Sequence, residues 1–370
     1  MTIAYVNARV LTEGGFRDDV AVVVDNGMIE AIVAADDVAV DEVRDLGGDF
    51  LVPGFIDVQV NGGGDVLFND APTVESIRRI GAAHRRFGTT GFLPTLISDD
   101  VEKMRAAIAA VDAAIAEGVS GVVGIHLEGP YLAPARRGVH DETKFRVPDA
   151  DEIALASSLK NGRTVLTLAP ERVSVETIRE LTERGVIVCA GHTAATYDQT
   201  RTGLDAGMRG FTHLYNAMSP LTSREPGAVG AALDDRESWC GIVVDGFHVH
   251  PASLRIALAA KPRGKVFLVT DAMPPVGGES ATYALGGVTI TCRDGRCETP
   301  DGVLAGSALD MASAVRNSVA TLGVDLAEAV RMASTYPADF LGLHTQGRIA
   351  PGAAANLVVL DRALHVRETI

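Results

Sequence analysis

Four residues whose side chains bind metal ions or move protons stand at the ends of short hydrophobic runs. They are Glu128 in HLEGP, His192 in AGHT, His213 in THLYNAM and Asp271 in TDA. One carboxylate and two imidazoles make an open catalytic metal shell that leaves a position for water. A divalent ion held by Glu128, His192 and His213 would lower the pKa of that water and polarise a carbonyl. Asp271 would then act as general base, and afterwards as general acid toward a leaving nitrogen.

The first run that could enter a barrel, LVPGFIDVQV, leads to Gln59 and Asn61. Many metal-dependent hydrolases have His-x-His at this place, and amides are poor ligands for zinc or iron. We therefore expect Gln59 and Asn61 to lie beside the metal ligands without binding the metal. Because no lysine ends the fourth predicted strand, a carbamylated lysine that bridges two metals is also absent. These patterns predict one divalent ion per chain, with Zn²⁺ as the first candidate and Fe²⁺, Co²⁺ or Mn²⁺ as alternatives.

The remaining titratable residues near strand ends give weaker signals. His126 lies two residues before Glu128 on the same predicted strand face, so we expect it to be a structural residue one layer deeper in the barrel. His250 precedes Pro251 at a predicted helix start, and its role stays open. Packing, surface or rim positions are expected for His84, His344, His365 and Glu171.

Eight hydrophobic runs with strand character follow one another from about residue 51, and helical patterns separate most of them. In the helical stretches, apolar residues recur at three- and four-residue spacing. Eight strands with intervening helices predict an α/β fold, a (β/α)8 TIM barrel, in which function belongs at the C-terminal strand ends. The predicted strands are 51–60, 90–96, 122–129, 163–171, 186–193, 210–217, 240–248 and 265–273. The clearest predicted helices are 74–88, 101–118, 174–185, 308–323 and 325–343.

Both chain ends have a different character from the centre. Short β-like runs and turns fill residues 3–50, with a hairpin signal at Asp25-Asn26-Gly27, and residues 347–370 look similar. We therefore expect one small, discontinuous β-sandwich domain built from residues 1–52 and 346–370. The metal-dependent catalytic barrel, residues 53–345, would be inserted between its two halves.

Composition narrows the choice of partners and compartment. The net charge of −15 over 370 residues argues against a nucleic-acid partner. The N-terminus lacks a signal-peptide pattern, and no run approaches the roughly 20 apolar residues that span a bilayer, so we expect a cytoplasmic protein without a membrane partner. The four cysteines form no CxxC pair, and we expect all of them to be reduced thiols. Cys292 and Cys297 flank RDGR, a predicted hairpin, and would be cross-strand neighbours.

Read in order, a series of motifs resembles the N-acetylglucosamine-6-phosphate deacetylase family of the amidohydrolase superfamily. The motifs are PGFIDVQVNG, HLEGPYL, AGHT, THLYNAM, REPG, DGFHVHP, VTDAM and GVLAGSAL. Each piece alone is weak, but the ordered set extends over nearly the whole chain. The resemblance implies metal-dependent hydrolysis of N-acetyl-D-glucosamine 6-phosphate to D-glucosamine 6-phosphate and acetate. Members with Gln-x-Asn in the first motif resemble the one-metal type.

The resemblance gives Glu128, His192 and His213 the role of metal ligands and Asp271 that of catalytic acid/base. It also implies a set of substrate-binding residues: Val139, His140, Asn216, Ala217, Arg224, His248, Leu304, Ala305 and Gly306. Among them, His140 would help to polarise the acetyl carbonyl. Arg224 and His248 match phosphate-binding residues, and in such enzymes part of the phosphate site can come from the partner subunit. The resemblance therefore implies a homodimer.

Several alternatives stay open from the sequence. A deacetylase of another N-acetyl sugar phosphate, such as N-acetylgalactosamine 6-phosphate, or an N-acyl-amino-acid deacylase would keep the fold and the metal. A non-enzymatic sugar-phosphate sensor on a decayed barrel is a different class, but the intact catalytic set argues against decay. The segment Ala133–Gly138 is either a lid or a solvated loop. Val139 stands where the family often has a small residue and would narrow the pocket slightly.

Overall fold

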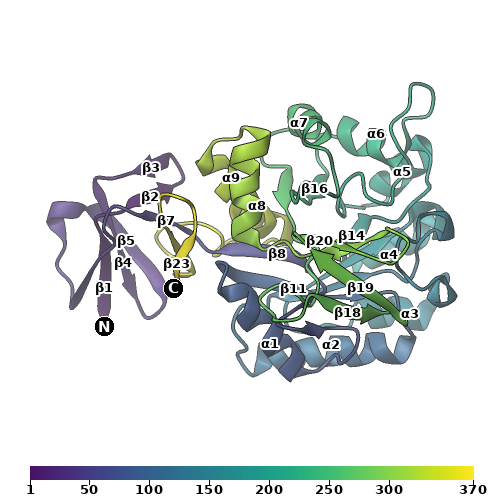
Figure 1. The fold of residues 1–370 in the computed structure, drawn as a ribbon, viewed down its shortest axis with the longest axis horizontal. Helices are drawn as coiled ribbons and strands as arrows, with labels where there is room; N and C mark the ends of the chain where they lie inside the picture. The colour runs from purple at the N-terminus through teal and green to yellow at the C-terminus, as the bar shows by residue number, and fades with distance from the viewer.

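The computed structural model describes residues 1–370, and its centre is an eight-stranded parallel barrel (Figure 1). Each strand is hydrogen-bonded to the next along the chain, and a bridge between Val60 and Ala272 closes the ring. The predicted (β/α)8 barrel is confirmed, and each strand coincides with one of the predicted runs. The barrel strands are β8 (Phe55–Val60), β11 (Thr89–Ile97), β12 (Gly124–Glu128), β13 (Arg163–Leu168), β14 (Ile187–Ala190), β15 (Gly210–Phe211), β16 (Trp239–Ile242) and β17 (Val266–Leu268).

Helices cover the outside of the barrel, and polar caps set where several of them begin. The side chains of Thr73, Ser174 and Thr196 accept backbone N–H groups at the starts of α1, α4 and α5. None of the helices combines the length and the apolar character needed to span a lipid bilayer. The helices are α1 (Val74–Arg85), α2 (Val101–Ala116), α3 (Ala150–Ala156), α4 (Val175–Glu183), α5 (Tyr197–Asp205), α6 (Gly227–Asp234), α7 (Pro251–Ala260), α8 (Met311–Asn317), α9 (Leu326–Ala333) and α10 (Thr335–Leu341).

Strands from both chain ends form two further sheets around a core of their own, on the side of α8 and α9 away from the barrel (Figure 1). One sheet has the order β5-β4-β1-β6 and the other β23-β22-β7-β2-β3. Asn26 and Gly27, with φ of 48° and 75°, make the predicted hairpin turn. The strands are β1 (Thr2–Val6), β2 (Arg9–Thr12), β3 (Gly15–Arg17), β4 (Val20–Asp25), β5 (Met28–Ala34), β6 (Glu42–Asp45), β7 (Phe50–Pro53), β22 (Leu357–Leu360) and β23 (Val366–Thr369). The domain borders at residues 52/53 and 345/346 stay a prediction.

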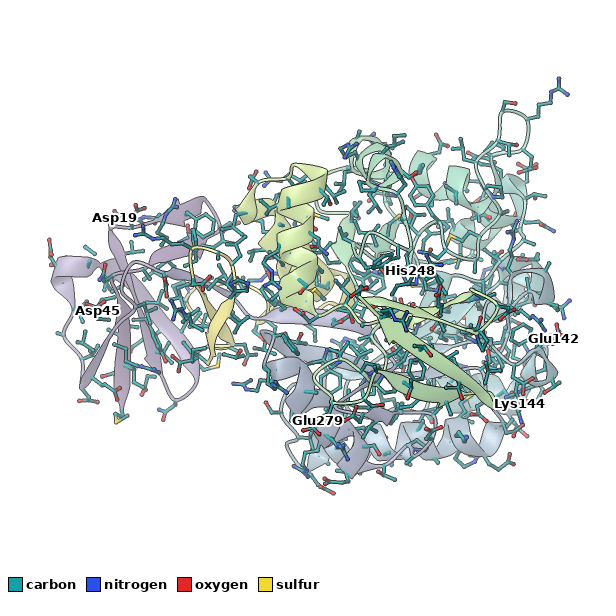
Figure 2. All side chains as sticks on the ribbon, in the orientation of Figure 1. Asp19, Asp45, Glu142, Lys144, His248 and Glu279 are labelled. Carbon is teal, nitrogen blue, oxygen red and sulfur yellow. A yellow bond between two sulfur atoms is a disulfide. The ribbon has the colours of Figure 1, made fainter.

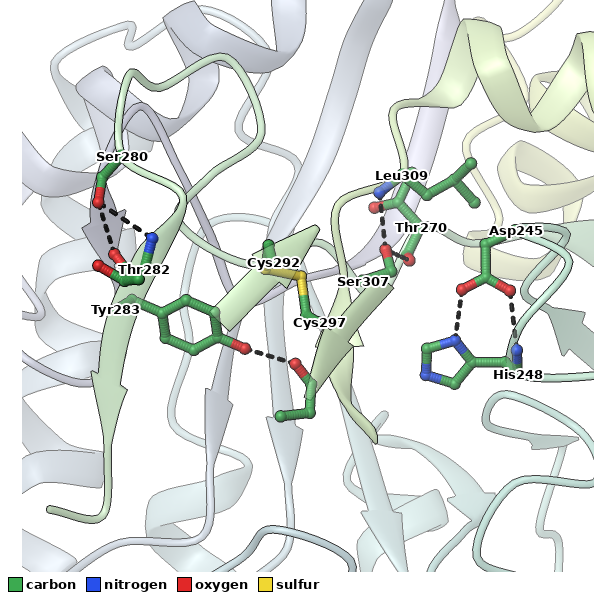
Figure 3. The surroundings of a disulfide bond; sticks show 11 residues. Asp245, His248, Thr270, Ser280, Thr282, Tyr283, Cys292, Cys297, Ser307 and Leu309 are labelled. Carbon is green, nitrogen blue, oxygen red and sulfur yellow. Dashed lines mark hydrogen bonds and ion pairs between the residues drawn. A yellow bond between two sulfur atoms is a disulfide. The ribbon is translucent and has the colours of Figure 1, made fainter. Parts of the chain in front are cut away.

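A four-stranded antiparallel sheet follows the last barrel strand, and the sequence pattern revealed only its central hairpin at RDGR. Its strands are β18 (Thr282–Leu285), β19 (Val288–Arg293), β20 (Arg296–Glu298) and β21 (Leu304–Ser307), beside the short pair β9 (Gly62–Gly63) and β10 (Val66–Leu67). Cys292 and Cys297 are direct partners in the predicted hairpin, and a disulfide joins them (Figure 3). The expectation of four reduced thiols is wrong for this pair, because antiparallel pairing puts their Cα atoms 4.0 Å apart. Cys189 and Cys240 are free and buried.

Asp57 of β8 links the first barrel strand to Thr270, which follows the last barrel strand, β17. Its Oδ2 accepts a hydrogen bond from Thr270 Oγ1 at 2.5 Å, and its Oδ1 accepts from the backbone N–H groups of Thr270 and Gln59. The carboxyl group is fully buried, and this burial raises the pKa of Asp57 to about 7 although the hydrogen bonds act in the opposite direction.

Asp57→Asn should therefore change how stability depends on pH. The carboxyl pKa is about 7 in the folded chain and about 3.9 in the unfolded chain, so folding takes up a proton between these values. The contribution of Asp57 to the free energy of unfolding falls as the pH rises through this window, by up to about 1.4 kcal/mol per pH unit. Urea titrations across the window should show the wild type losing stability relative to the variant as the pH rises. A difference that does not vary with pH would mean that Asp57 is ionised throughout.

Candidate active site

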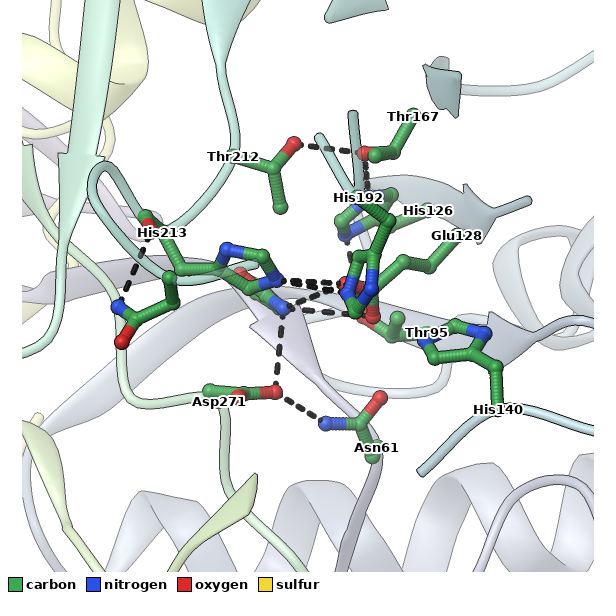
Figure 4. A network of polar contacts seen from close by, with 12 residues as sticks. Asn61, Thr95, His126, Glu128, His140, Thr167, His192, Thr212, His213 and Asp271 are labelled. Atoms are coloured by element: carbon green, nitrogen blue, oxygen red, sulfur yellow. Dashed lines mark hydrogen bonds and ion pairs between the residues drawn. The ribbon is translucent and has the colours of Figure 1, made fainter. Parts of the chain in front are cut away.

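The four predicted catalytic residues come together at the mouth of the barrel (Figure 4). Glu128 ends β12, and His192, His213 and Asp271 follow the ends of β14, β15 and β17. The last three have positive φ angles of 46°, 32° and 53°. Such backbone costs about 1–3 kcal/mol for a non-glycine residue and concentrates at functional sites. These turns directly after the strands let side chains from separate strands converge.

Three atoms that can bind a metal ion form a tight triangle at this point, which we call the donor triangle. Glu128 Oε1 lies 2.9 Å from His213 Nε2 and 3.3 Å from His192 Nε2, and the two Nε2 atoms are 3.2 Å apart. Ligands about 2.0–2.2 Å from a tetrahedral ion are roughly 3.3 Å from one another. The triangle therefore has the size of a metal-binding face, and its His2Glu composition fits a divalent ion.

Hydrogen bonds on the far side of the ring fix His192. Its Nδ1 lies 2.8 Å from the Arg136 carbonyl oxygen, so Nδ1 bears the proton and Nε2 presents its lone pair to the triangle. Glu171, which we expected to be only a rim residue, accepts hydrogen bonds from Thr193 Oγ1 and the Ala194 N–H, both at 2.6 Å. Glu171 thus holds the turn that follows His192.

His140 is a fourth residue with a ring nitrogen that could bind a metal ion, and it faces the same space. Ligand atoms of Glu128, His140 and His192 all lie within 4.8 Å of one another. His213 is the better third ligand, because its Nε2 is within 3.2 Å of both partners, whereas His140 is already bound through Nδ1 to Ser98 Oγ at 2.9 Å. His140 is therefore better placed to face a substrate beside the triangle.

The amides of Gln59 and Asn61 point to the two carboxylates. Gln59 Nε2 lies 3.3 Å from both Glu128 oxygens and 3.1 Å from Asp271 Oδ1. Asn61 Nδ2 donates to the same Asp271 oxygen at 2.7 Å. Since Gln59 contacts Glu128 and both amides contact Asp271, the two residues lie beside the triangle. That they do not bind the metal stays a prediction.

Burial and neighbouring charge give the two carboxyl groups opposite properties. Burial raises the pKa of Glu128, but the contacts of Oε1 with the His192 and His213 rings outweigh it and hold that pKa well below its usual range. Burial and the charge of Glu128 together raise the pKa of Asp271. One carboxylate is therefore suited to bind a cation and the other to exchange protons.

A cavity of about 250 Å³ opens above the triangle. Most of the substrate-binding residues carried over from the resemblance line it: Val139, His140, Asn216, Ala217, His248, Leu304 and Gly306. It is also lined by residues that sequence reasoning missed: Ile97, Gly138, Met273, Leu285 and Val303. Leu285 ends β18, which no motif covers, whereas Val303 lies within the motif GVLAGSAL but was not singled out.

Two residues carried over from the resemblance lie outside this cavity. Ala305 is fully buried, and its carbonyl accepts a hydrogen bond from the Tyr283 hydroxyl (Figure 3). Ala305 therefore does not line the sugar site as expected, because alternation along β21 turns it away while Leu304 and Gly306 face the cavity. Arg224 is exposed on the loop before α6 and does not reach the cavity of its own chain.

His248 lies at the cavity wall supplied by the loop after β16 (Figures 2 and 3). Its Nδ1 donates to Asp245 Oδ2 at 2.6 Å, and Asp245 Oδ1 accepts the backbone N–H groups of Phe247 and His248 at 2.9 Å. Burial raises the pKa of Asp245, but these hydrogen bonds and the His248 ring outweigh it and lower that pKa. The carboxylate thus fixes the ring with Nδ1 occupied and Nε2 free.

Two further histidines have structural roles. His126 does not line the cavity, and its Nε2 lies 2.7 Å from Thr167 Oγ1, which agrees with a structural position below Glu128. His250, whose role the sequence left open, caps α7 by accepting the backbone N–H of Ala252.

Comparison with known proteins shows to which family a chain with this site belongs. A model of the amidohydrolase family matches residues 50–369. This chain belongs to the amidohydrolase family. An N-acetylgalactosamine-6-phosphate deacetylase of Shewanella sp. (strain ANA-3) is 43% identical over 96% of this chain and 91% of its own length. An N-acetylglucosamine-6-phosphate deacetylase of Haemophilus influenzae is 33% identical over 100% of this chain and 98% of its own. The crystal structure of N-acetylglucosamine-6-phosphate deacetylase from Pasteurella multocida has a TM-score of 0.97 at 35% identity, and covers 100% of this chain and 98% of that one.

In this amidohydrolase, the donor triangle predicts one tightly held divalent ion per chain. Elemental analysis of protein purified without added metal should find about one ion per chain, the number that three protein ligands around one open site can hold. His213→Ala should lose most of that metal, because two ligands remain. His344→Ala, which changes an exposed histidine, should keep it. Two tightly bound ions in the wild type would contradict the single-ion site.

Proposed function

We propose that this amidohydrolase cleaves the acetamide of N-acetyl-D-glucosamine 6-phosphate and releases D-glucosamine 6-phosphate and acetate. The observation that supports this most is the donor triangle of Glu128, His192 and His213, with Asp271 beside it in one cavity. Relatives over nearly the full chain with this activity in their names support the substrate class. We further propose a cytosolic location. Because the net charge is −15, we also propose that there is no nucleic-acid partner.

Glu128, His192 and His213 would hold a single divalent ion, with Zn²⁺ as the first candidate and Fe²⁺, Co²⁺ or Mn²⁺ as alternatives. Such an ion, when bound, polarises the acyl carbonyl and lowers the pKa of water. Gln59 and Asn61 support the single-ion proposal because they contact the carboxylates through N–H groups, which cannot bind a cation.

His140 polarises the acetyl oxygen. The backbone N–H of Ser98 points at its Nδ1 from 3.4 Å, which assigns the proton to Nε2. Burial lowers the pKa of His140 to about 3, so the ring is neutral at pH 7. A neutral imidazole with Nε2–H donates a hydrogen bond to the acyl oxygen without exchanging its proton.

Asp271 moves the proton. Asn61 and Gln59 both donate to Oδ1, so Oδ2 is available for the reaction. Oδ2 takes a proton from the attacking water and passes it to the leaving nitrogen, which cannot depart as an anion. The pKa of this carboxyl is raised toward neutral pH. This helps Asp271 both to accept the proton from water and to release it to the nitrogen.

The phosphate lies at the opposite wall, where His248 presents Nε2 to the cavity. We propose that Arg224 completes this site in a second copy of the chain, so that the working enzyme is a homodimer. The exposure of Arg224, and of Leu221 on the same loop at 56%, supports a contact outside its own chain. Arg224 would then bind the phosphate from the partner subunit.

N-acetylgalactosamine 6-phosphate is the second candidate substrate, and the Shewanella relative at 43% identity favours it. The two sugars differ only in the configuration of one ring hydroxyl, so the same metal site and acid/base serve both. No similarity reported above favours an N-acyl-amino-acid substrate, and the intact triangle with Asp271 does not fit a decayed sensor.

Acetate release from both N-acetyl sugars, each with and without the 6-phosphate, tests the proposed function. We expect hydrolysis of N-acetyl-D-glucosamine 6-phosphate, with kcat/KM reduced at least about 10²-fold when the phosphate is absent, since remote binding energy orients the amide. If kcat/KM is more than about tenfold higher (about 1.4 kcal/mol) for N-acetylgalactosamine 6-phosphate, that sugar replaces the first candidate as the substrate. No acetate from either phosphate would refute the proposal.

Arg224→Ala should reproduce the loss of the phosphate. It should lower kcat/KM for the phosphorylated sugar by about 10²-fold, because an Arg–phosphate contact is a strong charge-assisted hydrogen bond, and it should leave the unphosphorylated sugar nearly unchanged. Arg172→Ala, at another exposed arginine, is the matched control. An equal loss on both sugars would assign Arg224 a structural role.

Asp271→Asn tests the proton transfer. The amide keeps the size and polarity of the side chain but lacks basicity, so we expect kcat to fall by at least about 10²-fold. Metal content and KM should stay near the wild-type values. Metal content, thermal midpoint and kcat should be measured on one preparation. A folded, metal-loaded variant that retains kcat would rule out this role.

A further inference from the structure

A second space of about 310 Å³ lies between the loop 137–141 and the sheet β18–β21. We call it the side groove. It shares Gly138, Val139, His140, Leu285 and Val303 with the catalytic cavity. Since these residues line both spaces, the side groove lies directly beside the catalytic cavity.

The side groove has apolar side chains along the strands and polar ones, among them Arg137, Asp141, Thr299 and Asp301, along the loops. Val139, Leu285, Val288, Ile290 and Val303 line it, while its charged residues belong to the loops. Val288 and Val303 are 41% and 42% exposed, which places them among the few large apolar side chains that this chain leaves open to solvent. Apolar side chains gathered on a cavity wall mark a site for an apolar ligand group.

A disulfide and a side-chain hydrogen bond stabilise the sheet that forms this wall. The Cys292–Cys297 disulfide joins β19 to β20, and the Tyr283 hydroxyl bonds the Ala305 carbonyl across the sheet (Figure 3). Ile290 and Cys297 are fully buried in the cluster beneath it. The side groove is therefore preformed, and a ligand would not have to order it.

The direction of the side groove selects which part of a substrate enters it. It starts at His140, on the loop that follows β12, whereas His248 follows β16, four strands away in the ring of eight. The two residues thus approach the cavity from opposite sides of the barrel. With the phosphate at His248 and the acyl oxygen at His140, the ring and phosphate extend one way and the acyl chain the other.

We propose that the side groove receives N-acyl chains longer than acetyl, so that the enzyme also deacylates N-propionyl and N-butyryl amino-sugar 6-phosphates. The proposal rests on the proposed function, because it uses the same site. Water adds to the acyl carbon and the C–N bond breaks. The products are the carboxylate of the longer acid and the protonated amine, with Asp271 transferring the proton.

A closed acetyl pocket and an open groove predict different dependence on chain length. One misplaced methylene in a closed pocket changes kcat/KM by roughly 10–200-fold. In a groove lined by valine and leucine, each added methylene instead leaves water for an apolar wall, which is favourable.

The test compares N-acetyl, N-propionyl and N-butyryl derivatives of the same amino-sugar 6-phosphate. For the wild type we expect kcat/KM to stay within about tenfold across the series, below the penalty of a closed pocket. Val288→Trp should fill the side groove, because Val288 lines it but not the catalytic cavity. The variant should reduce the butyryl-to-acetyl ratio by at least about tenfold and leave acetyl hydrolysis nearly unchanged.

Thr289→Trp is the matched control, since this exposed neighbour points to the other face of β19 and lines neither space. It should keep the wild-type ratio. A wild type that hydrolyses the butyryl compound more than about 10²-fold slower than the acetyl compound would overturn the proposal, because that is closed-pocket behaviour. A Val288→Trp variant with an unchanged ratio would also overturn it. Absence of acetyl hydrolysis in the wild type would instead refute the proposed function itself.

Discussion

The site depends on keeping two carboxylates close together deep in the barrel mouth. Glu128 and Asp271 both accept hydrogen bonds from the single Gln59 Nε2, at 3.3 and 3.1 Å. Two carboxylates this close raise each other's pKa, unless neighbouring groups stabilise the negative charge of one of them. The His192 and His213 rings hold the pKa of Glu128 low, whereas burial and the charge of Glu128 raise the pKa of Asp271 despite its amide donors and the charges of His213 and His248. The contrast leaves one carboxylate for a cation and one for a proton, so the chemistry follows from unequal surroundings of two similar groups.

The contact between the first and last barrel strands also positions Asp271. Asp57 holds Thr270, and the Thr270 carbonyl accepts from Ser307 Oγ at 2.6 Å. The Ser307 N–H in turn donates to the Asp271 carbonyl at 2.9 Å. Ser307 ends β21, so the sheet that lines the cavity is tied directly to the backbone of Asp271. The cavity wall and Asp271 are thereby parts of one hydrogen-bonded unit.

Much of this could be predicted from the sequence because a barrel is periodic. Buried parallel strands appear as hydrophobic runs, and residues just after them must meet at one rim, which was enough to bring Glu128, His192, His213 and Asp271 together. The sheet β18–β21 could not be found this way, since its short strands are half exposed and separated by glycine turns. Ala305 was misplaced for the same reason, because its alternation with Leu304 and Gly306 is visible only once β21 is recognised. Arg224 was carried over from the resemblance, and the structure leaves it exposed outside the cavity of its own chain, because no strand pattern sets where the loop before α6 extends.

Three histidines around the cavity show how one side chain serves three tasks. In each, the protein binds Nδ1 and leaves Nε2 to the cavity, but the partner at Nδ1 differs. A carbonyl at His192 leaves a lone pair at Nε2, an N–H at His140 leaves an Nε2 that can donate a hydrogen bond, and a carboxylate at His248 fixes the ring with Nε2 free. The identity of the residue is thus common to all three, and its function is set by a neighbour that lies outside the cavity. Sequence motifs name the histidines, whereas the backbone of the 136 loop, the end of β11 and Asp245 decide what each of them does.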